Sequence, residues 1–102
     1  MLNTRTEELT YPAVIEPNGC GGYGVYFPDL PGCGSYGDSF EETLANGREA
    51  LKLHIYGMQE DDEAIPDPSG AVSLSEEVPE GCAVSLITAH PDRMKRIVEN
   101  KQ

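Results

Sequence analysis

The chain has 102 residues, of which 38% are apolar, and carries a formal net charge of −11 at pH 7. This length and apolar content predict one globular domain over residues 1–102, with a modest core and no room for a second domain. The longest apolar run, Tyr11 to Ile15, is too short for a secretion signal or a membrane span, so we expect a soluble, cytoplasmic protein. Three cysteines without paired spacing favour a reducing compartment over a disulfide framework.

The charge is unevenly distributed along the chain. Residues 1–90 contain sixteen acidic and three basic side chains, whereas residues 91–102 contain two acidic and four basic ones. A body this acidic repels phosphate backbones, which makes nucleic acid a poor partner and a basic protein a good one. Many soluble proteins are acidic without having such a partner, so charge alone does not decide the function.

Two strands are predicted near the N-terminus. Residues 1–8 are polar, lack periodicity and are expected to fray, whereas Leu9–Glu16 alternates in the manner of a strand. The Asn-Gly pair in Pro17–Gly22 then favours a hairpin into a second strand over Tyr23–Phe27. The pattern G-x-G-x-x-G also occurs, at Gly19–Gly24, but a dinucleotide site needs a helix next and a strand follows, so we reject that interpretation.

A turn and a long helix follow. Two prolines and two glycines between Pro28 and Gly34 take the chain out of the sheet, and Ser35–Tyr36 forms a short return strand. Ser39 and Glu42 have the spacing of a capping box, in which a hydroxyl and a carboxylate each accept a hydrogen bond from a backbone amide. The helix is predicted over residues 39–60. Its apolar stripe, expected to pack on the sheet, consists of Phe40, Leu44, Gly47, Leu51, Ile55 and Met58.

A glycine and a run of acids mark the end of this helix. Gly57 either weakens the last turn or allows a close approach to the sheet. The run Glu60–Glu63 stands where the helix dipole disfavours anions, so it either contacts a basic partner or is an ordinary solvated terminus. Asp62 tolerates the left-handed conformation in which helices stop.

A loop, a strand and a short helix complete the chain. Prolines preclude regular structure over most of Ile65–Pro79. Cys82–Ala89 is an apolar run typical of a buried strand, and a right-handed crossover through the helix would place it parallel to the first strand. The fold class is therefore α+β, in the order β-β-β-α-β, with a mixed four-stranded sheet of order 3-2-1-4 and the main helix on one face. Residues 90–102 are predicted to form a short basic helix.

The motifs of residues 11–69 resemble those of the HicB family of antitoxins. The resemblance lies in FPDLPGC at 27–33, GDSFEETLANGREAL at 37–51 and the acidic loop that ends in IPDPS at 65–69. It implies a partial RNase H-like fold. It also implies stoichiometric binding to a small, basic, mRNA-cleaving HicA-type toxin, whose RNA-binding surface and catalytic histidine the antitoxin would cover. Many HicB proteins append a DNA-binding domain, but only thirteen residues follow Ala89, so we expect none here and no basis for DNA binding.

No catalytic centre, metal site or cofactor is predicted. Nucleases of the RNase H-like class hold metal ions on carboxylates at the strand centres, but the first strand has no acid before Glu16 and the last strand has none. The three cysteines and two histidines lack zinc-site spacing. Cys33 is expected to fill a small site in the turn, and His54 to be a partly buried packing residue. The sequence leaves a catalytic Cys–His pair possible, although no motif indicates one.

Surface recognition is the remaining activity. The helix covers one face of the sheet and leaves Tyr26, Val14 and Tyr36 on the other, where exposed tyrosines can anchor a protein interface or simply be half-exposed. The predicted partner-binding residues are Tyr26, Asp29, Leu30, Pro31, Tyr36, Asp61, Asp62 and Glu63. The open face and the sheet edges at the third and fourth strands also favour a homodimer or a higher oligomer.

Three functions fit these features. A HicB-like antitoxin is the leading one. A stand-alone RNA-binding or RNA-processing protein of the same fold is supported only by the basic tail, with Arg93, Lys95, Arg96 and Lys101, and would bind RNA in a salt-sensitive manner. The third is an orphan homo-oligomeric domain without a toxin. A neighbouring gene for a short basic protein would favour the antitoxin.

Overall fold

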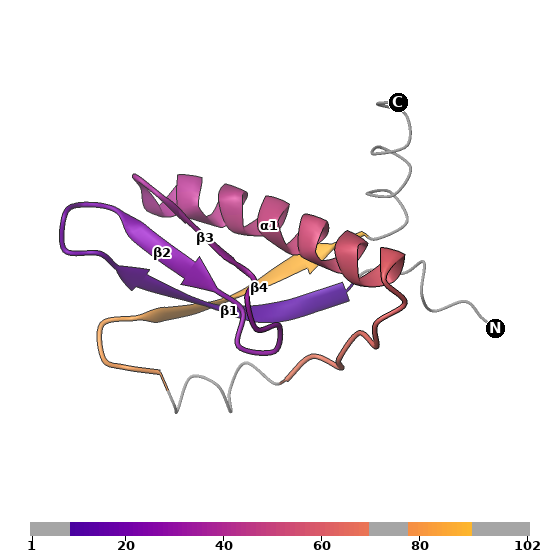
Figure 1. Ribbon diagram of the computed structural model, residues 1–102. Helices are drawn as coiled ribbons and strands as arrows, with labels where there is room; N and C mark the ends of the chain where they lie inside the picture. The colour runs from indigo at the N-terminus through magenta and orange to yellow at the C-terminus, as the bar shows by residue number, and fades with distance from the viewer. Residues whose placement is uncertain (1–8, 70–77, 91–102) are drawn as a thin grey trace, which may run out of the picture.

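The computed structural model describes residues 9–69 and 78–90, which form four strands and one helix (Figure 1). The elements are β1 (Leu9–Pro17), β2 (Tyr23–Tyr26), β3 (Gly34–Gly37), α1 (Phe40–Glu60) and β4 (Ala83–Ala89). The predicted α+β class and the order β-β-β-α-β are confirmed. The predicted frayed N-terminus lies outside the described residues, as does the predicted C-terminal helix apart from His90.

The sheet has the predicted strand order, β3-β2-β1-β4, but every pairing in it is antiparallel. The predicted parallel pairing of the first and last strands, and with it the mixed sheet, is wrong. After α1 the chain has returned to the end of the sheet where β1 begins (Figure 1). β4 starts with Ala83 opposite Ile15, at the far end of β1, and therefore runs antiparallel to it.

The core lies between the sheet and α1. Tyr11, Ala13 and Ile15 face it from β1, as the alternation predicts, and Leu51 and Ile55 face it from the helix. Its remaining buried members are Val25, Phe27, Leu30, Cys33, Ile87 and Ala89. β4 is an edge strand in which only Ile87 and Ala89 are buried, so the prediction of a buried strand is correct only for its last residues.

The helix begins at the predicted residue with a modified capping box. Ser39 is the N-cap, and its Oγ accepts a hydrogen bond from the Glu42 amide at 3.0 Å. The Glu42 carboxylate accepts from the amide of Asp38 at 2.7 Å, one residue before the amide used in a standard capping box. The bond to the Glu42 amide satisfies one of the amides that the first turn of a helix leaves without a partner.

The helix ends in a Schellman motif built on a non-glycine residue. The amide of Glu63 donates to the carbonyl of Met58 at 2.9 Å, and the amide of Asp62 donates to that of Gln59 at 3.2 Å. Asp62 has a φ of 56°, which confirms the predicted left-handed helix stop.

A close approach between helix and sheet occurs at Gly47 rather than at Gly57. A Cβ at Gly47 would lie 3.2 Å from Val25 Cγ1 and 3.4 Å from Ile87 Cδ1, whereas a Cβ at Gly57 would meet nothing within 4 Å. Gly37 at the end of β3 is closer still, because a Cβ there would lie 2.7 Å from the amide nitrogen of Thr43. Glycines therefore set how closely the start of α1 lies on β2 and β3.

Candidate protein-binding surface

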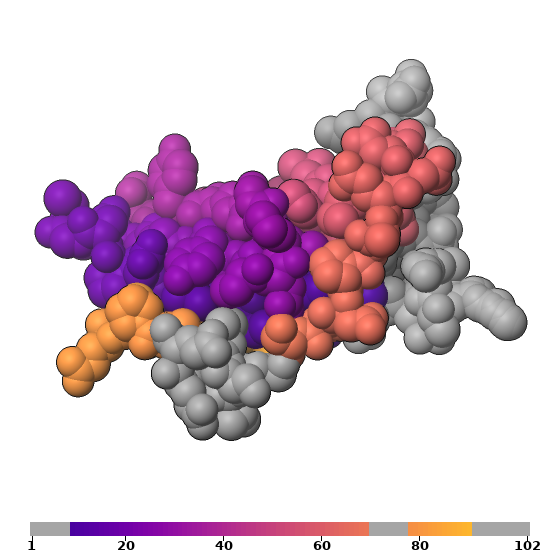
Figure 2. All heavy atoms as spheres, turned by 60° about the horizontal axis from the view of Figure 1, so that its bottom comes forward, coloured from indigo at the N-terminus to yellow at the C-terminus, as the bar shows by residue number. Residues whose placement is uncertain are grey.

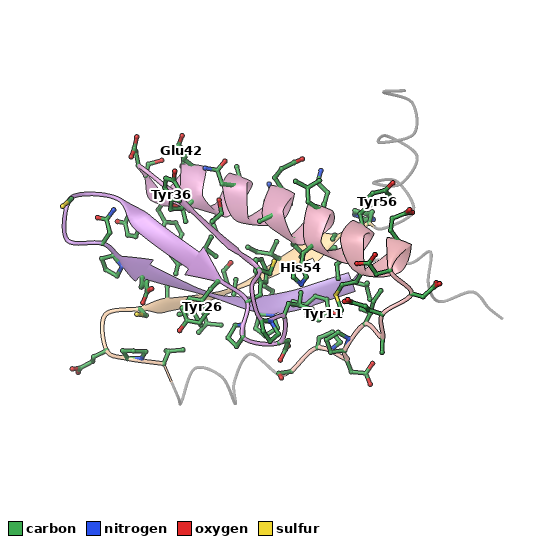
Figure 3. All side chains as sticks on the ribbon, viewed as in Figure 1. Tyr11, Tyr26, Tyr36, Glu42, His54 and Tyr56 are labelled. Atoms are coloured by element: carbon green, nitrogen blue, oxygen red, sulfur yellow. The ribbon has the colours of Figure 1, made fainter. Side chains whose placement is uncertain are left out.

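The face of the sheet away from α1 carries the two tyrosines that the sequence predicts there. Tyr26 is 38% exposed and Tyr36 is 76% exposed. Tyr36 stands opposite Gly24 and Tyr26 opposite Gly34, so the two tyrosines are diagonal neighbours on one face of the β2–β3 pair. Figure 2 views the molecule from the side away from α1, with the early strands (indigo to purple) at its centre, and Figure 3 labels both tyrosines.

The same face continues across β1 to an exposed leucine on β4. Val14 lies opposite both Tyr26 and Val84, and Pro12 lies opposite Leu86. Val14 is fully buried although it faces away from α1, whereas Leu86 is 58% exposed. We call the set Tyr26, Tyr36 and Leu86 the open face. Sequence reasoning missed Leu86 because it treated the last strand as buried.

The proline-rich turn after β2 divides its side chains between core and solvent. Backbone bonds from Leu30 to Phe27 and from Cys33 to Leu30 fold it tightly. Phe27, Leu30 and Cys33 all point inward, and Leu30 is only 1% exposed. Leu30 is therefore a core residue, and the partner-binding role predicted for it has no exposed side chain to act through. Pro31 is exposed at the tip of the turn.

The carboxylate of Asp29, the acidic residue of this turn, is hydrogen-bonded to another part of the chain. It accepts hydrogen bonds from the amide of Ser69 at 2.7 Å and from the Ser69 hydroxyl at 2.6 Å. Tyr11 donates its hydroxyl to the carbonyl of Pro66 at 2.5 Å. These contacts join the turn and the start of β1 to the segment 64–69. Burial, and after it the charges of Asp29 and Asp67, raise the pKa of Tyr11 above its ordinary value.

The predicted acidic site at the end of α1 is exposed, but no described hydrogen bond or ion pair joins it to the tyrosines. Asp61, Asp62 and Glu63 are all on the surface. Residues 9–69 and 78–90 contain twelve acidic and two basic side chains. Both basic residues, Arg48 and Lys52, lie on α1, where Lys52 pairs with Glu49 at 3.5 Å. The surface described is therefore strongly negative, with its only cations on the helix.

The cysteines and histidines show no arrangement for metal binding within the described residues, where no group of three or more His, Cys, Asp or Glu could hold an ion. The three cysteines are free. Cys33 fills a buried site, as predicted, with its thiol 3.7 Å from the carbonyl of Ala50, and burial raises its pKa to about 11. His54 is half-buried on α1, as expected for a packing residue. In the described part of the chain no helix has both the length and the apolar character needed to cross a bilayer.

The family model for the "HicB_like antitoxin of bacterial toxin-antitoxin system" matches residues 11–100. The chain belongs to this family of HicB-like antitoxins. The match extends beyond the motif-bearing residues 11–69 and includes β4.

Curated relatives agree with this assignment. Antitoxin HicB 1 of Photorhabdus laumondii is 40% identical over 62 residues, which cover 61% of this chain and 40% of that protein. Antitoxin HicB 2 of the same organism is 33% identical over 82 residues, covering 80% of this chain and 58% of that protein. An uncharacterized 14.9 kDa protein of Haemophilus phage HP1 is 48% identical over 58 residues, covering 57% of this chain and 43% of that protein. The chain thus matches less than two thirds of the length of each of these relatives.

Solved structures show the same fold. The N-terminal domain of the Burkholderia pseudomallei antitoxin HicB superposes with a TM-score of 0.66 at 26% identity, covering 78% of this chain and 95% of that domain. The HicA3 and HicB3 toxin–antitoxin complex contains a chain that superposes with a TM-score of 0.60 at 27% identity, with 78% of this chain and 95% of that chain covered.

Proposed function

We propose that this chain is an antitoxin that neutralises a basic, HicA-type toxin by binding it stoichiometrically. Membership of the HicB-like family supports this proposal, as does the likeness to a chain of a HicA3–HicB3 complex. The antitoxin acts by covering the toxin's RNA-binding surface and catalyses no reaction of its own. The observation that carries the proposal is the open face, where two tyrosines are exposed on the sheet of a strongly acidic protein.

In this proposal, the net charge and the exposed tyrosines have different roles in toxin binding. A net charge of −11 attracts a cationic protein over several ångströms, which raises the association rate and is weakened by salt. Tyr26 and Tyr36 supply large, rigid side chains of the kind that dominate interface energies. Asp29 contributes less, because its carboxylate is already bonded to Ser69.

Co-expression with the toxin tests the function itself. A short, basic, HicA-type protein from the same genome is expressed alone and together with this chain, and growth and mRNA integrity are followed. We expect arrest with the basic protein alone and recovery when both are made. Failure to recover, or cleavage of RNA by this chain by itself, would refute the antitoxin assignment. RNA binding that weakens with salt would favour the stand-alone RNA-binding protein instead.

Calorimetry with substituted chains tests the open face. Tyr26→Ala and Tyr36→Ala should each weaken toxin binding by roughly 30-fold, the loss of about 2 kcal/mol typical of an interface anchor. Tyr56→Ala is the matched control, because Tyr56 is half-buried on α1, away from the open face (Figure 3). If the two β-strand variants bind as well as the control, the toxin docks elsewhere while the antitoxin function stands.

A further inference from the structure

β4 is an unprotected sheet edge. It pairs with β1 on one side only, and no other described strand lies along its second side. Sheet edges are normally guarded by charged side chains, prolines, bulges or short length, because exposed amides and carbonyls recruit further strands. The sequence of β4, AVSLITA, contains no charged residue and no proline over its seven residues. In contrast, the opposite edge is the four-residue β3, with glycine at both ends.

The chemistry of β4 is nearly symmetric about its central residue, Leu86. An antiparallel copy centred there would place Ala83 opposite Ala89, Val84 opposite Thr88 and Ser85 opposite Ile87, with Leu86 opposite its own counterpart. Such self-complementarity is what a two-fold interface requires. The pairing would also cover Leu86, which is 58% exposed on a strand that is otherwise partly sheltered.

The pairing of β1 with β4 indicates which backbone groups of β4 are free. The Thr10 and Thr88 hydroxyl oxygens are 2.8 Å apart, the close approach typical of an antiparallel pair that exchanges no backbone hydrogen bonds. Pro12 opposite Leu86 has no amide hydrogen to exchange. Since the two kinds of pair alternate, the amides and carbonyls of Val84, Leu86 and Thr88 point to the outer edge. A pairing centred on Leu86 would therefore bond these same residues.

We propose that two copies of this chain pair antiparallel along β4, with Leu86 opposite Leu86, to form a continuous eight-stranded sheet. This goes beyond the proposed function and does not rest on it. The near-symmetric sequence of β4 selects a second copy of this chain as the occupant. The absence of charged residues on the strand allows two acidic chains to approach each other there.

Sedimentation or light scattering of the full chain tests this, from micromolar to submillimolar concentration. We expect the unsubstituted chain to form dimers. Leu86→Lys and Leu86→Glu each place like charges directly opposite one another and should weaken self-association by roughly a hundredfold. Leu53→Lys is the matched control, since Leu53 is 53% exposed but lies on α1, and it should leave the dimer unchanged.

Mixing the two charged variants distinguishes the loss of the proposed pairing from a general disruption of the fold. The Leu86→Lys and Leu86→Glu chains, each monomeric alone, should form a heterodimer when combined, because their opposite charges then face each other. A monomeric unsubstituted chain, an unchanged Leu86→Lys dimer, or the absence of recovery on mixing would each overturn the proposal.

Discussion

Gly47 offers a direct test of how α1 lies on the sheet. Replacing it by Ala adds a methyl group whose carbon would stand 3.2 Å from Val25 Cγ1 and 3.4 Å from Ile87 Cδ1, closer than ordinary van der Waals contact. Alanine gains about 1 kcal/mol over glycine inside a helix. Inserting a carbon into a packed core costs about 1–3 kcal/mol. The free energy of unfolding of the Gly47→Ala chain should therefore lie between no change and a loss of about 2 kcal/mol.

Gly57→Ala in the same helix is the matched control, because a Cβ there meets nothing within 4 Å. It should raise the free energy of unfolding by about 1 kcal/mol through helix propensity alone. Urea unfolding of both variants then measures the packing cost as their difference, about 1–3 kcal/mol. If the m-values agree, the difference reflects stability and not a change in the denatured state. Equal stabilisation by both substitutions would refute the close approach of α1 to β2 and β4.

Three further outcomes are expected. Asp62→Gly should raise the free energy of unfolding in urea by about 1 kcal/mol, because glycine adopts the φ of 56° without the strain of a side chain. An Asp62→Ala chain as stable as the Asp62→Gly chain would contradict this. The folded-state pKa of Tyr11 is raised above 10.0, so stability from its neutral hydroxyl should be complete below pH 10 and decline as pH rises through the folded-state pKa. Tyr11→Phe should lose about 1 kcal/mol at pH 7 and show a smaller decline on alkaline titration. With a pKa of about 11 and a buried thiol, Cys33 should resist alkylation at pH 8 while exposed Cys20 reacts, as peptide mapping would show; equal rates would contradict its burial.

Local sequence patterns predicted the helix and the strands, because the formation of each depends on residues that are close in sequence. The alternation in β1, the apolar stripe of α1 and the Ser39 cap all express short-range chemistry. The structure confirms the alternation and the cap, and confirms the stripe in part: Gly47, Leu51 and Ile55 are buried, whereas Phe40 is exposed and the buried Thr43 was not predicted. The direction of β4 does not follow from such patterns. It depends on which end of the sheet β4 starts from, and nothing in the local pattern of Ala83–Ala89 specifies that end.

The positions of the candidate site residues were predicted only in part, because local patterns indicate some of them and long-range contacts determine the others. Tyr26 and Tyr36 follow from strand alternation, whereas the bonds from Ser69 to Asp29 join residues forty positions apart and leave no sequence signal. Leu30 was predictable. It stands three residues after Phe27 and three before Cys33, and these three apolar side chains are buried together in the tight turn.

The two proposed interactions should respond differently to salt, because one charge distribution governs both. Toxin binding brings a cationic protein to a body of charge −11, so added salt screens an attraction and should weaken it. Self-pairing through β4 brings two such bodies together over an uncharged strand. Glu80, the acid that precedes β4 in the described chain, stands six residues before Leu86 and outside the strand. Salt should therefore leave self-pairing unchanged or strengthen it slightly. Dissociation constants measured for both equilibria at low and high salt would decide this, and a dimer that dissociates as salt rises would mean that ion pairs, and not the β4 edge, hold the two copies together.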